Sequence, residues 1–324
     1  MRTATKVWLL IAAFLVLIGC ILFAGVMTML NWDFMELATV EYETNIYEIS
    51  EAFDIISMNT DTADIVFVCS DDGICRVECY EEANAKHSAT VTDGTLTVEL
   101  MDERSAYGFI GYIGLNFGTP KITVYLPKTE YSNLLINGVT GDIVIPNGFL
   151  FQNIDISLRT GDVDFCASAS ALLKIKISTG DICVEDMTAA SLDLTVSTGK
   201  VTVSGVTCQG DVAVTVSTGN TYLTDIVCKS VISSGDTGDI SLNHVIATEQ
   251  FSIERSTGNV KFDGSDAAAI FVKTDTGDVT GNLLTDKVFI AQTDTGNVNV
   301  PKTVNGGRCE ITTDTGNIKI TIKQ

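Results

Sequence analysis

The chain has 324 residues, with 20 Lys and Arg against 41 Asp and Glu, for a net charge of −21 at pH 7. A surface this acidic repels nucleic acid and anionic lipid, which excludes nucleic-acid binding as a function class and favours cations or basic partners. Only 4 prolines, 27 glycines and abundant Val, Ile and Thr indicate β structure, and the length suits two ordinary domains or one elongated repeat array.

The first predicted element is a membrane-spanning helix over residues 7–30, which contain no charged residue. About 20 apolar residues cross a bilayer, whereas the apolar core of a signal peptide is usually about 7–15 residues long. Arg2 and Lys6 precede the helix, and acidic residues follow it from Asp33 onward. The excess of positive charge on the cytoplasmic side of membrane proteins therefore predicts a single-pass protein, with residues 1–6 in the cytoplasm and residues 31–324 outside.

An alternative reading of the same segment is a lipoprotein signal. Leu17-Ile18-Gly19-Cys20 resembles a bacterial lipoprotein processing box, in which the cysteine is lipidated and becomes the new N-terminus. The apolar run continues through Ile21-Leu22-Phe23, where lipoproteins usually turn polar, so we favour the spanning helix. Both readings hold the rest of the chain at the outer face of a membrane.

Residues 31–51 read as a polar, acidic juxtamembrane segment, and residues 52–139 as an irregular N-terminal part of a solenoid, with strand-like runs at 65–69, 74–80, 96–100 and 121–126. Asp61-Thr62-Ala63-Asp64 resembles a decayed copy of the turn motif described next, because Ala63 lies four periods before Gly141. The Gly- and aromatic-rich stretch from Tyr107 to Thr119 is expected to be a loop folded over the core, with a binding patch as the alternative.

A Thr-Gly-Asp/Asn/Lys motif recurs from residue 140 to the end, and a fixed period in this range is the sequence signature of a solenoid. Residues 140–324 are therefore predicted to form a regular β-solenoid, with one turn glycine in each coil. The glycines recur every 19 or 20 residues, at Gly141, Gly161, Gly180, Gly199, Gly219, Gly238, Gly258, Gly277, Gly296 and Gly316.

Apolar residues around each glycine predict how a coil is built. Relative to Gly199, they occur at −7, −5 and −3, then at +2 and +4, and again at +7. Each segment alternates like a strand with one buried face, and each change of parity requires an extra residue at a corner. This predicts an all-β fold, a parallel β-solenoid with three-faced coils of 19–20 residues. Parallel crossovers are nearly always right-handed, so we expect right-handed coils.

The N-terminal helix, the Asp61-Thr62-Ala63-Asp64 and Asp93-Gly94-Thr95-Leu96-Thr97-Val98 segments and the Ser/Asp-Thr-Gly-Asp/Asn repeats together resemble the DUF4097 family of bacterial β-strand repeat proteins. The resemblance covers residues 50–324. It implies a bacterial cell-surface solenoid of the kind labelled as an adhesin, and it brings no catalytic residues. Related proteins are often encoded near envelope-stress or transcriptional-regulation genes, which implies a second function as a signalling accessory.

Three aspartates two residues before the turn glycine are expected to stack in three consecutive coils: Asp275, Asp294 and Asp314. Stacked carboxylates repel one another, and Ca²⁺ with oxygen ligands would relieve that repulsion. A solvated turn face explains the same residues, and the nonapeptide repeat of calcium-binding β-helices is missing. Calcium is therefore the one cofactor that the pattern allows, and the expectation is that the protein has none.

The cysteines are expected to be mostly small buried side chains. Cys208 and Cys228 both fall at +9 and should stack in adjacent coils, and Cys309 falls at an inward position. Because disulfides are permitted outside the cell, the pair to test is Cys69 with Cys75 or Cys79.

The sequence carries no catalytic motif and predicts a protein that is not an enzyme. It has two histidines, His87 and His244, the second expected at an outer corner. Lys174 and Lys176 with Asp162, Asp164 and Asp181 could imitate the charged face of a polysaccharide-cleaving β-helix, but charged outward side chains on strands are expected anyway. The leading hypothesis is a binding scaffold for an unidentified envelope, glycan or protein ligand, and the alternative is an envelope-stress or signalling accessory acting on a membrane partner.

Overall fold

The computed structural model describes residues 3–32, 41–102 and 118–323. The one helix in these ranges is α1 (Thr3–Met29), and its residues 7–29 are long and apolar enough to cross a membrane. These residues are exposed except Met27, which is buried. A signal sequence near an N-terminus meets the same criteria. Most of the predicted loop at 107–119 lies outside the described residues.

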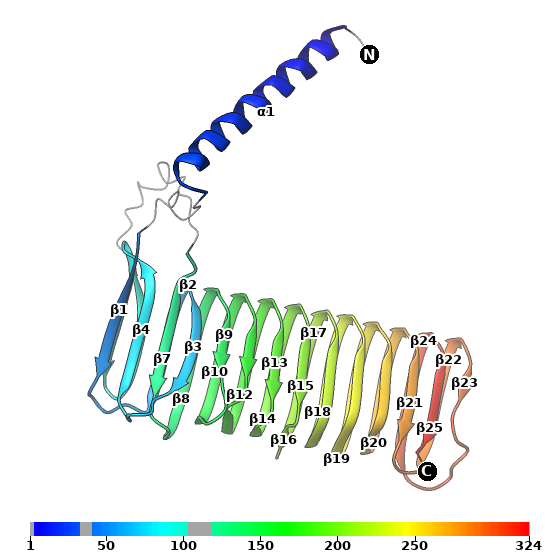
Figure 1. The fold of residues 1–324 in the computed structure, drawn as a ribbon. Coiled ribbons are helices and arrows are strands. Elements are labelled where there is room, and N and C mark those ends of the chain that lie inside the picture. Colours follow the sequence, from blue (N-terminus) through cyan, green and yellow to red (C-terminus); the bar gives the residue numbers. More distant parts are fainter. Residues whose placement is uncertain (1–2, 33–40, 103–117, 324) are drawn as a thin grey trace.

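All other elements are strands, and they run along one elongated body (Figure 1). The first seven are β1 (Tyr42–Ile49), β2 (Ile55–Thr62), β3 (Asp64–Cys69), β4 (Cys75–Glu82), β5 (Ala85–Thr92), β6 (Thr95–Asp102) and β7 (Lys121–Leu126). The next ten are β8 (Glu130–Thr140), β9 (Ile143–Ile145), β10 (Leu150–Thr160), β11 (Val163–Phe165), β12 (Ser168–Thr179), β13 (Ile182–Glu185), β14 (Thr188–Thr198), β15 (Val201–Ser204), β16 (Thr207–Cys208) and β17 (Asp211–Thr218). The last eight are β18 (Thr221–Thr237), β19 (Ile240–Thr257), β20 (Val260–Thr276), β21 (Val279–Leu283), β22 (Lys287–Thr295), β23 (Val298–Asn299), β24 (Gly307–Thr315) and β25 (Ile318–Ile322).

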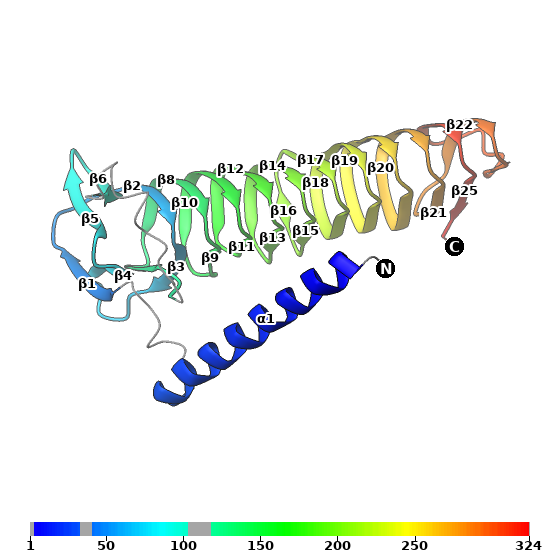
Figure 2. The ribbon, with the colours of Figure 1, turned by 90° about the horizontal axis from the view of Figure 1, so that it is seen from above.

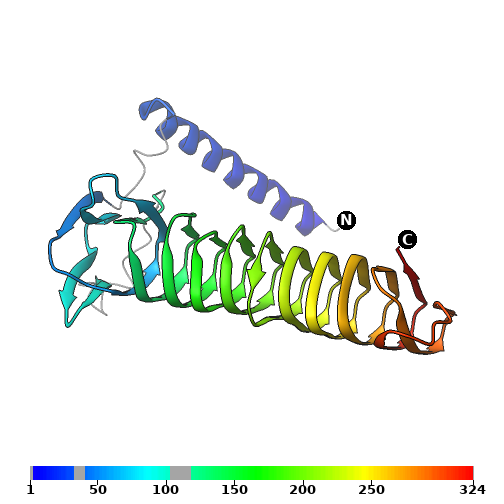
Figure 3. The same cartoon turned by 90° about the horizontal axis from the view of Figure 1, so that it is seen from below.

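From β8 onward the chain forms the predicted parallel β-solenoid, seen from two sides in Figures 2 and 3. Each coil pairs with the next in three blocks. Between β18 and β19, for example, residues 221–224, 226–228 and 230–237 pair with 240–243, 245–247 and 250–257. Asp225, which separates the first two blocks, has a positive φ of 51°, and the register shifts between Cys228 and Ser230. These interruptions are the corners that the parity changes predict.

The turn glycines form a column in which each one touches the next. All ten have φ between 133° and 159°, a region that favours glycine. A Cβ added to Gly199 would lie 1.9 Å from the carbonyl oxygen of Gly180, and the other nine meet the carbonyl of the preceding coil in the same way. Ala63 stands first in this column, since the carbonyl that a Cβ on Gly141 would meet is its own. Unlike the ten glycines, Ala63 has no positive φ, so its backbone accepts a side chain. The alanine is only 3% exposed, at the place where β6 and β7 pair in parallel with β2 and β3.

The N-terminal region is a cap in which antiparallel strands join the parallel stack. β2 and β3 make a first coil, because β2 pairs in parallel with β8, and β3 with β9. β1 pairs antiparallel with β4, and β4 antiparallel with β7. β5 and β6 form an antiparallel hairpin. Residues 42–49 of the segment expected to be juxtamembrane are thus strand β1, and the folded region begins before residue 52.

At the other end, the order of the coils in space differs from their order in the sequence. β20 pairs with β24 rather than β22, and β24 then pairs with β22. The amide of Gly277 donates to the carbonyl of Thr315, and that of Gly316 donates to Thr295, so the coil of Gly316 lies between those of Gly277 and Gly296. Pro301 and Gly306-Gly307 interrupt the third side of the Gly296 coil, which lets the chain leave the stack and return inside it. Consecutive copies of the repeat are therefore not always consecutive coils.

Candidate functional site

The strongest cluster of chemically capable side chains lies inside the cap, on β4 and β5. Alternate residues of β4 face inward, and Cys75, Val77, Cys79 and Glu81 are all buried. Glu81 thus occupies a position where the strand pattern calls for an apolar residue. Its side chain is 1% exposed, and that of His87, inward on β5, is 4% exposed. A buried carboxylate is costly unless other groups hydrogen-bond to it.

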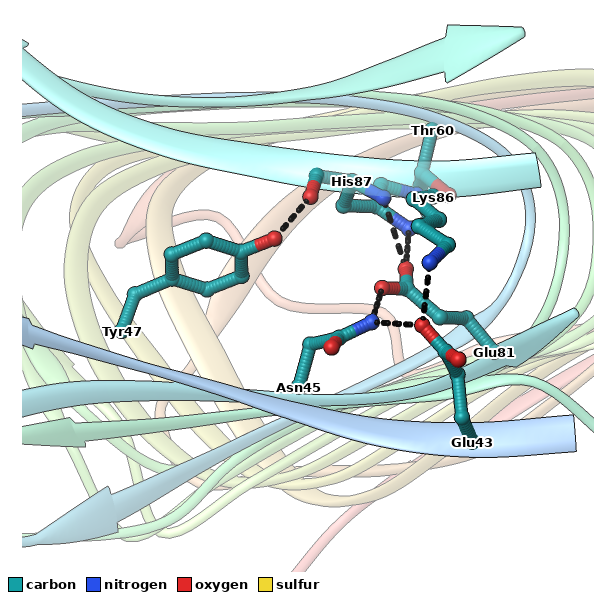
Figure 4. Close-up of polar contacts among 7 residues, drawn as sticks. All are labelled: Glu43, Asn45, Tyr47, Thr60, Glu81, Lys86 and His87. Carbon is teal, nitrogen blue, oxygen red and sulfur yellow. Dashed lines mark hydrogen bonds and ion pairs between the residues drawn. The ribbon is translucent and has the colours of Figure 1, made fainter. Parts of the chain in front are cut away.

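Glu81 receives hydrogen bonds on both oxygens (Figure 4). Oε2 accepts from the backbone N–H of His87 at 2.7 Å and lies 2.7 Å from its Nδ1, while Oε1 accepts from Nδ2 of Asn45 at 2.8 Å. The other ring nitrogen of His87, Nε2, lies 3.2 Å from Oγ1 of Thr60. An ionised carboxylate only accepts hydrogen bonds, so Nδ1 of His87 donates to Oε2 of Glu81.

A second layer of contacts links this cluster to the surface on β1 and β5. The hydroxyl of Tyr47 donates to the carbonyl of His87 at 2.6 Å, and burial, followed by the charge of Glu81, raises the pKa of Tyr47. Nδ2 of Asn45 also donates to Glu43, and Lys86 contacts the same carboxylate at 2.6 Å. These bonds to Lys86 and Asn45 lower the pKa of Glu43. With Thr60, the network joins four strands of the cap, β1, β2, β4 and β5.

Cys79 completes a set of three ligand types. Its sulfur, a carboxylate oxygen of Glu81 and a ring nitrogen of His87 lie within 4.8 Å of one another, and they form the one such group within the residues that the structure describes. Thiolate, carboxylate and imidazole are ligands of Zn²⁺. Burial raises the pKa of Cys79 to about 12, so without a metal its thiol is protonated and is a weak nucleophile. A metal would also have to replace the 2.7 Å contact between His87 and Glu81, and the network is satisfied without one.

Two cavities border the cluster. One of about 340 Å³ is lined by Glu81, His87, Asp61 and Pro120, among others, and one of about 210 Å³ by Tyr47, Lys86 and His87. His87 therefore lies between two small recesses of the cap. Ligand sites typically have volumes of about 300 to 1,000 Å³, so the first cavity is at the lower end of this range and the second is below it.

Asp275, Asp294 and Asp314 are exposed at their turns, and they do not form a ligand group of the kind found in the cap. Because the Gly316 coil is inserted, their order along the stack is Asp275, Asp314, Asp294. The prediction that Asp294 stacks directly on Asp275 is therefore wrong. The expectation remains that the protein has no cofactor, with calcium at this edge as the alternative.

The Asp or Asn that follows each turn glycine has a structural task that the sequence analysis missed. Oδ1 of Asp142 accepts from the backbone N–H of Asp162 at 2.9 Å, and Oδ1 of Asp162 accepts from that of Asp181 at 2.7 Å. The same bond recurs through the stack, starting from Asp64 and continuing past the inserted coil. We call this row of hydrogen bonds the +1 ladder. It is interrupted at Lys200, whose side chain has no acceptor. The recurring Asp/Asn at +1 was the available signal.

All nine cysteines are free thiols, including Cys69, Cys75 and Cys79, for which a disulfide was considered. Cys208, Cys228 and Cys309 are buried at their inward positions, and burial raises the pKa of Cys228 and Cys309 to about 12. The stack therefore uses cysteine as a small apolar side chain.

The charged residues considered as a polysaccharide-cleaving face are divided between two sides of the coil. Lys174 and Lys176 lie on β12, and Lys174 contacts Asp155 at 3.0 Å. Asp164 lies on β11, while Asp162 and Asp181 follow turn glycines and belong to the +1 ladder. His244 lies at a corner with φ of 53°, with its Nδ1 3.3 Å from Asp225. The five residues do not make one site.

Comparison with solved structures finds several bacterial solenoids at low sequence identity. A protein from Parabacteroides distasonis titled "putative lipid binding protein" is 18% identical over 75% of this chain and 95% of its own, with a TM-score of 0.52. A Bacteroides fragilis "putative adhesin" is 18% identical over 87% and 97%, with a TM-score of 0.41, and a second Parabacteroides distasonis "putative adhesin" is 10% identical over 76% and 98%, with a TM-score of 0.46. The first of these supports the fold, and no curated protein matches the chain.

The family model described as Toastrack DUF4097 matches residues 53–216 and 209–324, from the first coil to the end of the described stack. This range covers well over half of the chain and includes every turn glycine, and it agrees with the resemblance carried by the repeats. The chain belongs to the Toastrack DUF4097 family.

Proposed function

We propose that this protein is a non-enzymatic binding scaffold, held to the outer face of a bacterial cell membrane by α1 and displaying its solenoid to another envelope, glycan or protein component. The observation that carries the proposal is the continuous stack, which runs from β2 to β25 and presents rows of outward side chains along its sides. Parallel ladders with a shared core make such a body stiff and suited to extended contact surfaces.

The chemistry of the cap agrees with a non-enzymatic role. Its one thiol near a histidine, Cys79, is fully buried with its pKa raised to about 12, and Glu81 is occupied by Asn45 and His87. A catalytic thiol needs a lowered pKa and access to substrate. Relatives named as adhesins are in line with a binding role, and the charge of −21 suits a basic or cation-bridged ligand.

The test is co-sedimentation of the full chain in nanodiscs with cell-wall sacculi and intact cells, with and without Ca²⁺, and with empty nanodiscs as the control. We expect saturable binding. If chelation abolishes it, the triple variant Asp275→Asn, Asp294→Asn, Asp314→Asn should lose binding too, which would assign the calcium to that edge. No binding under any of these conditions would overturn the scaffold proposal.

A signalling accessory is the second candidate, and α1 favours it because all of its apolar span except Met27 is exposed. Exposed helix faces of this kind pack against partner helices in a bilayer. A chain ending at residue 41, before β1, keeps the helix and removes the folded region. An envelope-stress phenotype that survives this truncation would support the accessory role, and one that disappears would support the scaffold.

A further inference from the structure

The far end of the stack, away from the cap, finishes in a strand with an unpaired edge. The Gly296 coil is the last one, and its strand β22 pairs with β24 on one side. No other described strand pairs with β22 on the opposite side. It runs for nine residues without Pro or Gly, the residues that commonly interrupt an edge. The carbonyl of Lys287, at the start of β22, accepts from the hydroxyl of Thr303. Along the rest of the strand, no described strand pairs with the outer row of backbone N–H and C=O groups, so another strand could pair there.

Apolar side chains surround this edge. Phe289 and Ala291 face the core but are only partly buried, because no further coil covers them. Val288 and Ile290 point outward and are 38% and 51% exposed, and Val298 on the next side is 44% exposed. The end of the stack thus leaves both its core and part of its wall open to water.

The residues around this edge carry balanced charge, so two copies of this surface do not repel each other. Residues 284–306 contain two acidic and two basic residues, Asp286, Asp294, Lys287 and Lys302, although the whole chain carries −21. Strand β1, at the edge of the cap, would instead bring like charges together. If β1 of two copies paired antiparallel about its centre, Glu43 would face Glu48 of the other copy, and like charges directly opposite each other destabilise a sheet.

We propose that the β22 end is a self-association surface whose occupant is β22 of a second copy. A closed pair of identical strands is related by a two-fold axis, which makes the pairing antiparallel. Placing Ala291 opposite Ala291 of the other copy gives full overlap and sets Phe289 opposite Thr293, so that inward residues meet inward residues. A shift of one residue would place the core side chains against the solvent side, which fixes the parity of the register.

This pairing would continue the stack through the junction. Each β22 would gain the hydrogen-bond partners that interior strands already have, and Phe289 and Ala291 would be buried by the core of the other copy. The helix α1 joins the chain at the opposite end, at the cap, so two paired copies would carry their anchors at the two far ends. The inference rests on the proposed scaffold function and names its partner: a second copy, on a facing membrane.

The first experiment measures the mass of the full chain in detergent micelles by light scattering over a range of concentrations. We expect a dimer that dissociates on dilution. Ile290→Glu places two carboxylates beside the two-fold axis and should weaken the dimer by at least about 30-fold. Ile232→Glu is the matched control, because Ile232 is an outward isoleucine of similar exposure (41%) in the middle of the stack on β18. It should leave the dimer unchanged.

Unfolding midpoints of both variants close to that of the wild type would show that neither change acts through misfolding. A monomer at every concentration, or equal weakening by the two variants, would overturn the proposal. The second result would point to α1 as the contact.

A position-specific test uses Ala291→Cys under mild oxidation, with the wild type as background for the native thiols. A disulfide-linked dimer is expected only in the variant, and its absence would exclude this register.

Phosphatidylethanolamine/phosphatidylglycerol vesicles carrying the full chain should cluster, and Ile290→Glu should abolish clustering.

Sacculus binding measured on the same variants separates the two proposals. A chain that binds sacculi but neither dimerises nor clusters vesicles overturns self-association alone. A chain that clusters vesicles through β22 but binds no sacculi or cells contradicts the proposed envelope ligand and leaves self-association standing.

Discussion

The stack and the cap stabilise their strands by different means. In the stack, the same contacts recur in every coil: a glycine against the carbonyl of the previous coil, and an Asp or Asn Oδ1 accepting from the next backbone N–H. In the cap, strands run both parallel and antiparallel, and a single buried network around Glu81 and His87 joins β1, β2, β4 and β5. A contact that recurs in every coil can be predicted from the period of the sequence. A network that occurs once cannot, because its side chains come from strands that meet only after folding.

The largest difference is expected for alanine at a glycine with positive φ. Gly199→Ala combines a φ of 146° with a Cβ 1.9 Å from the Gly180 carbonyl, and we expect a loss of about 4–6 kcal/mol in unfolding free energy. Gly73→Ala in the cap has a φ of 75° but nothing within 4 Å of the new Cβ, and should cost about 1 kcal/mol. Urea unfolding of the full chain, followed by circular dichroism, compares them. Equal losses would show that close stacking of the glycine column does not matter.

Removing the buried acid of the cap is expected to have the next largest effect. Glu81→Leu leaves the backbone N–H and Nδ1 of His87 without their acceptor and removes one of the two acceptors of Asn45, and should cost about 3 kcal/mol. Glu78→Leu on the same strand is the control, because Glu78 is half-buried and has no part in the network. Limited proteolysis should show cleavage of the cap in Glu81→Leu with the stack intact. A variant as stable as the control would mean that the network contributes little.

The +1 ladder predicts a smaller effect with opposite signs at two sites. Asp162→Ala removes the acceptor for the N–H of Asp181 and should cost about 1 kcal/mol, whereas Asp162→Asn keeps Oδ1 and should not destabilise. Lys200→Asn supplies the missing acceptor opposite Asn220 and should stabilise by about 0.5–1 kcal/mol. Thermal unfolding midpoints give the order. If Ala and Asn at 162 behave alike, the ladder is not a stabilising feature.

The smallest expected effect is a pH dependence that differs in sign between the regions. Burial, and then the charges of Asp162, Asp142 and Glu185, raise the pKa of Asp164 in the stack, so its contribution to stability is full below its unfolded pKa and is lost as the pH rises through the folded one. Hydrogen bonds from Arg76 and Ser70 hold the pKa of Asp72 in the cap well below its usual range, so its contribution is present above the unfolded pKa and is lost as the pH falls.

Asn substitutions at these two positions test the signs. At pH 7, Asp164→Asn should raise the unfolding midpoint slightly and Asp72→Asn should lower it. The rise should vanish once the pH is below the unfolded pKa of an aspartate, and the loss should shrink as the pH falls. Shifts of the same sign at pH 7 would contradict the assignment.

The sequence predicted the stack well because each coil obeys one local rule. The spacing of Gly141 to Gly316 and the parity of the apolar residues around Gly199 fix the turns and the buried faces, and Ala63 takes the place of the first glycine. The period does not predict the order of the coils in space, however, because all copies of the repeat form equivalent strands. The insertion of the Gly316 coil beside Gly277 therefore had no signal in the spacing, although Pro301 marked the place where the chain departs.

The candidate site was less predictable. His87 stood out as one of two histidines, but Glu81 looked like an ordinary acid of an acidic strand. Its partner Asn45 comes from β1, and Thr60, the partner of His87, comes from β2. Antiparallel pairing of β1 with β4 brings them together across more than thirty residues, and no local pattern encodes that pairing. The Cys79 sulfur joins them because alternate residues of one strand share a face.

The exchanged order of the last two coils has a consequence for how the chain folds as it emerges from the ribosome. Coils up to Gly277 can be added one after another, each on the surface left by the one before. The next segment made, residues 287–299, has its docking surface on β24 and β25, which are synthesised later. It must wait, or occupy temporarily the place that β24 finally takes beside β20. The end of the molecule is thus built out of order, and its completion is the step of synthesis most exposed to a mispaired intermediate.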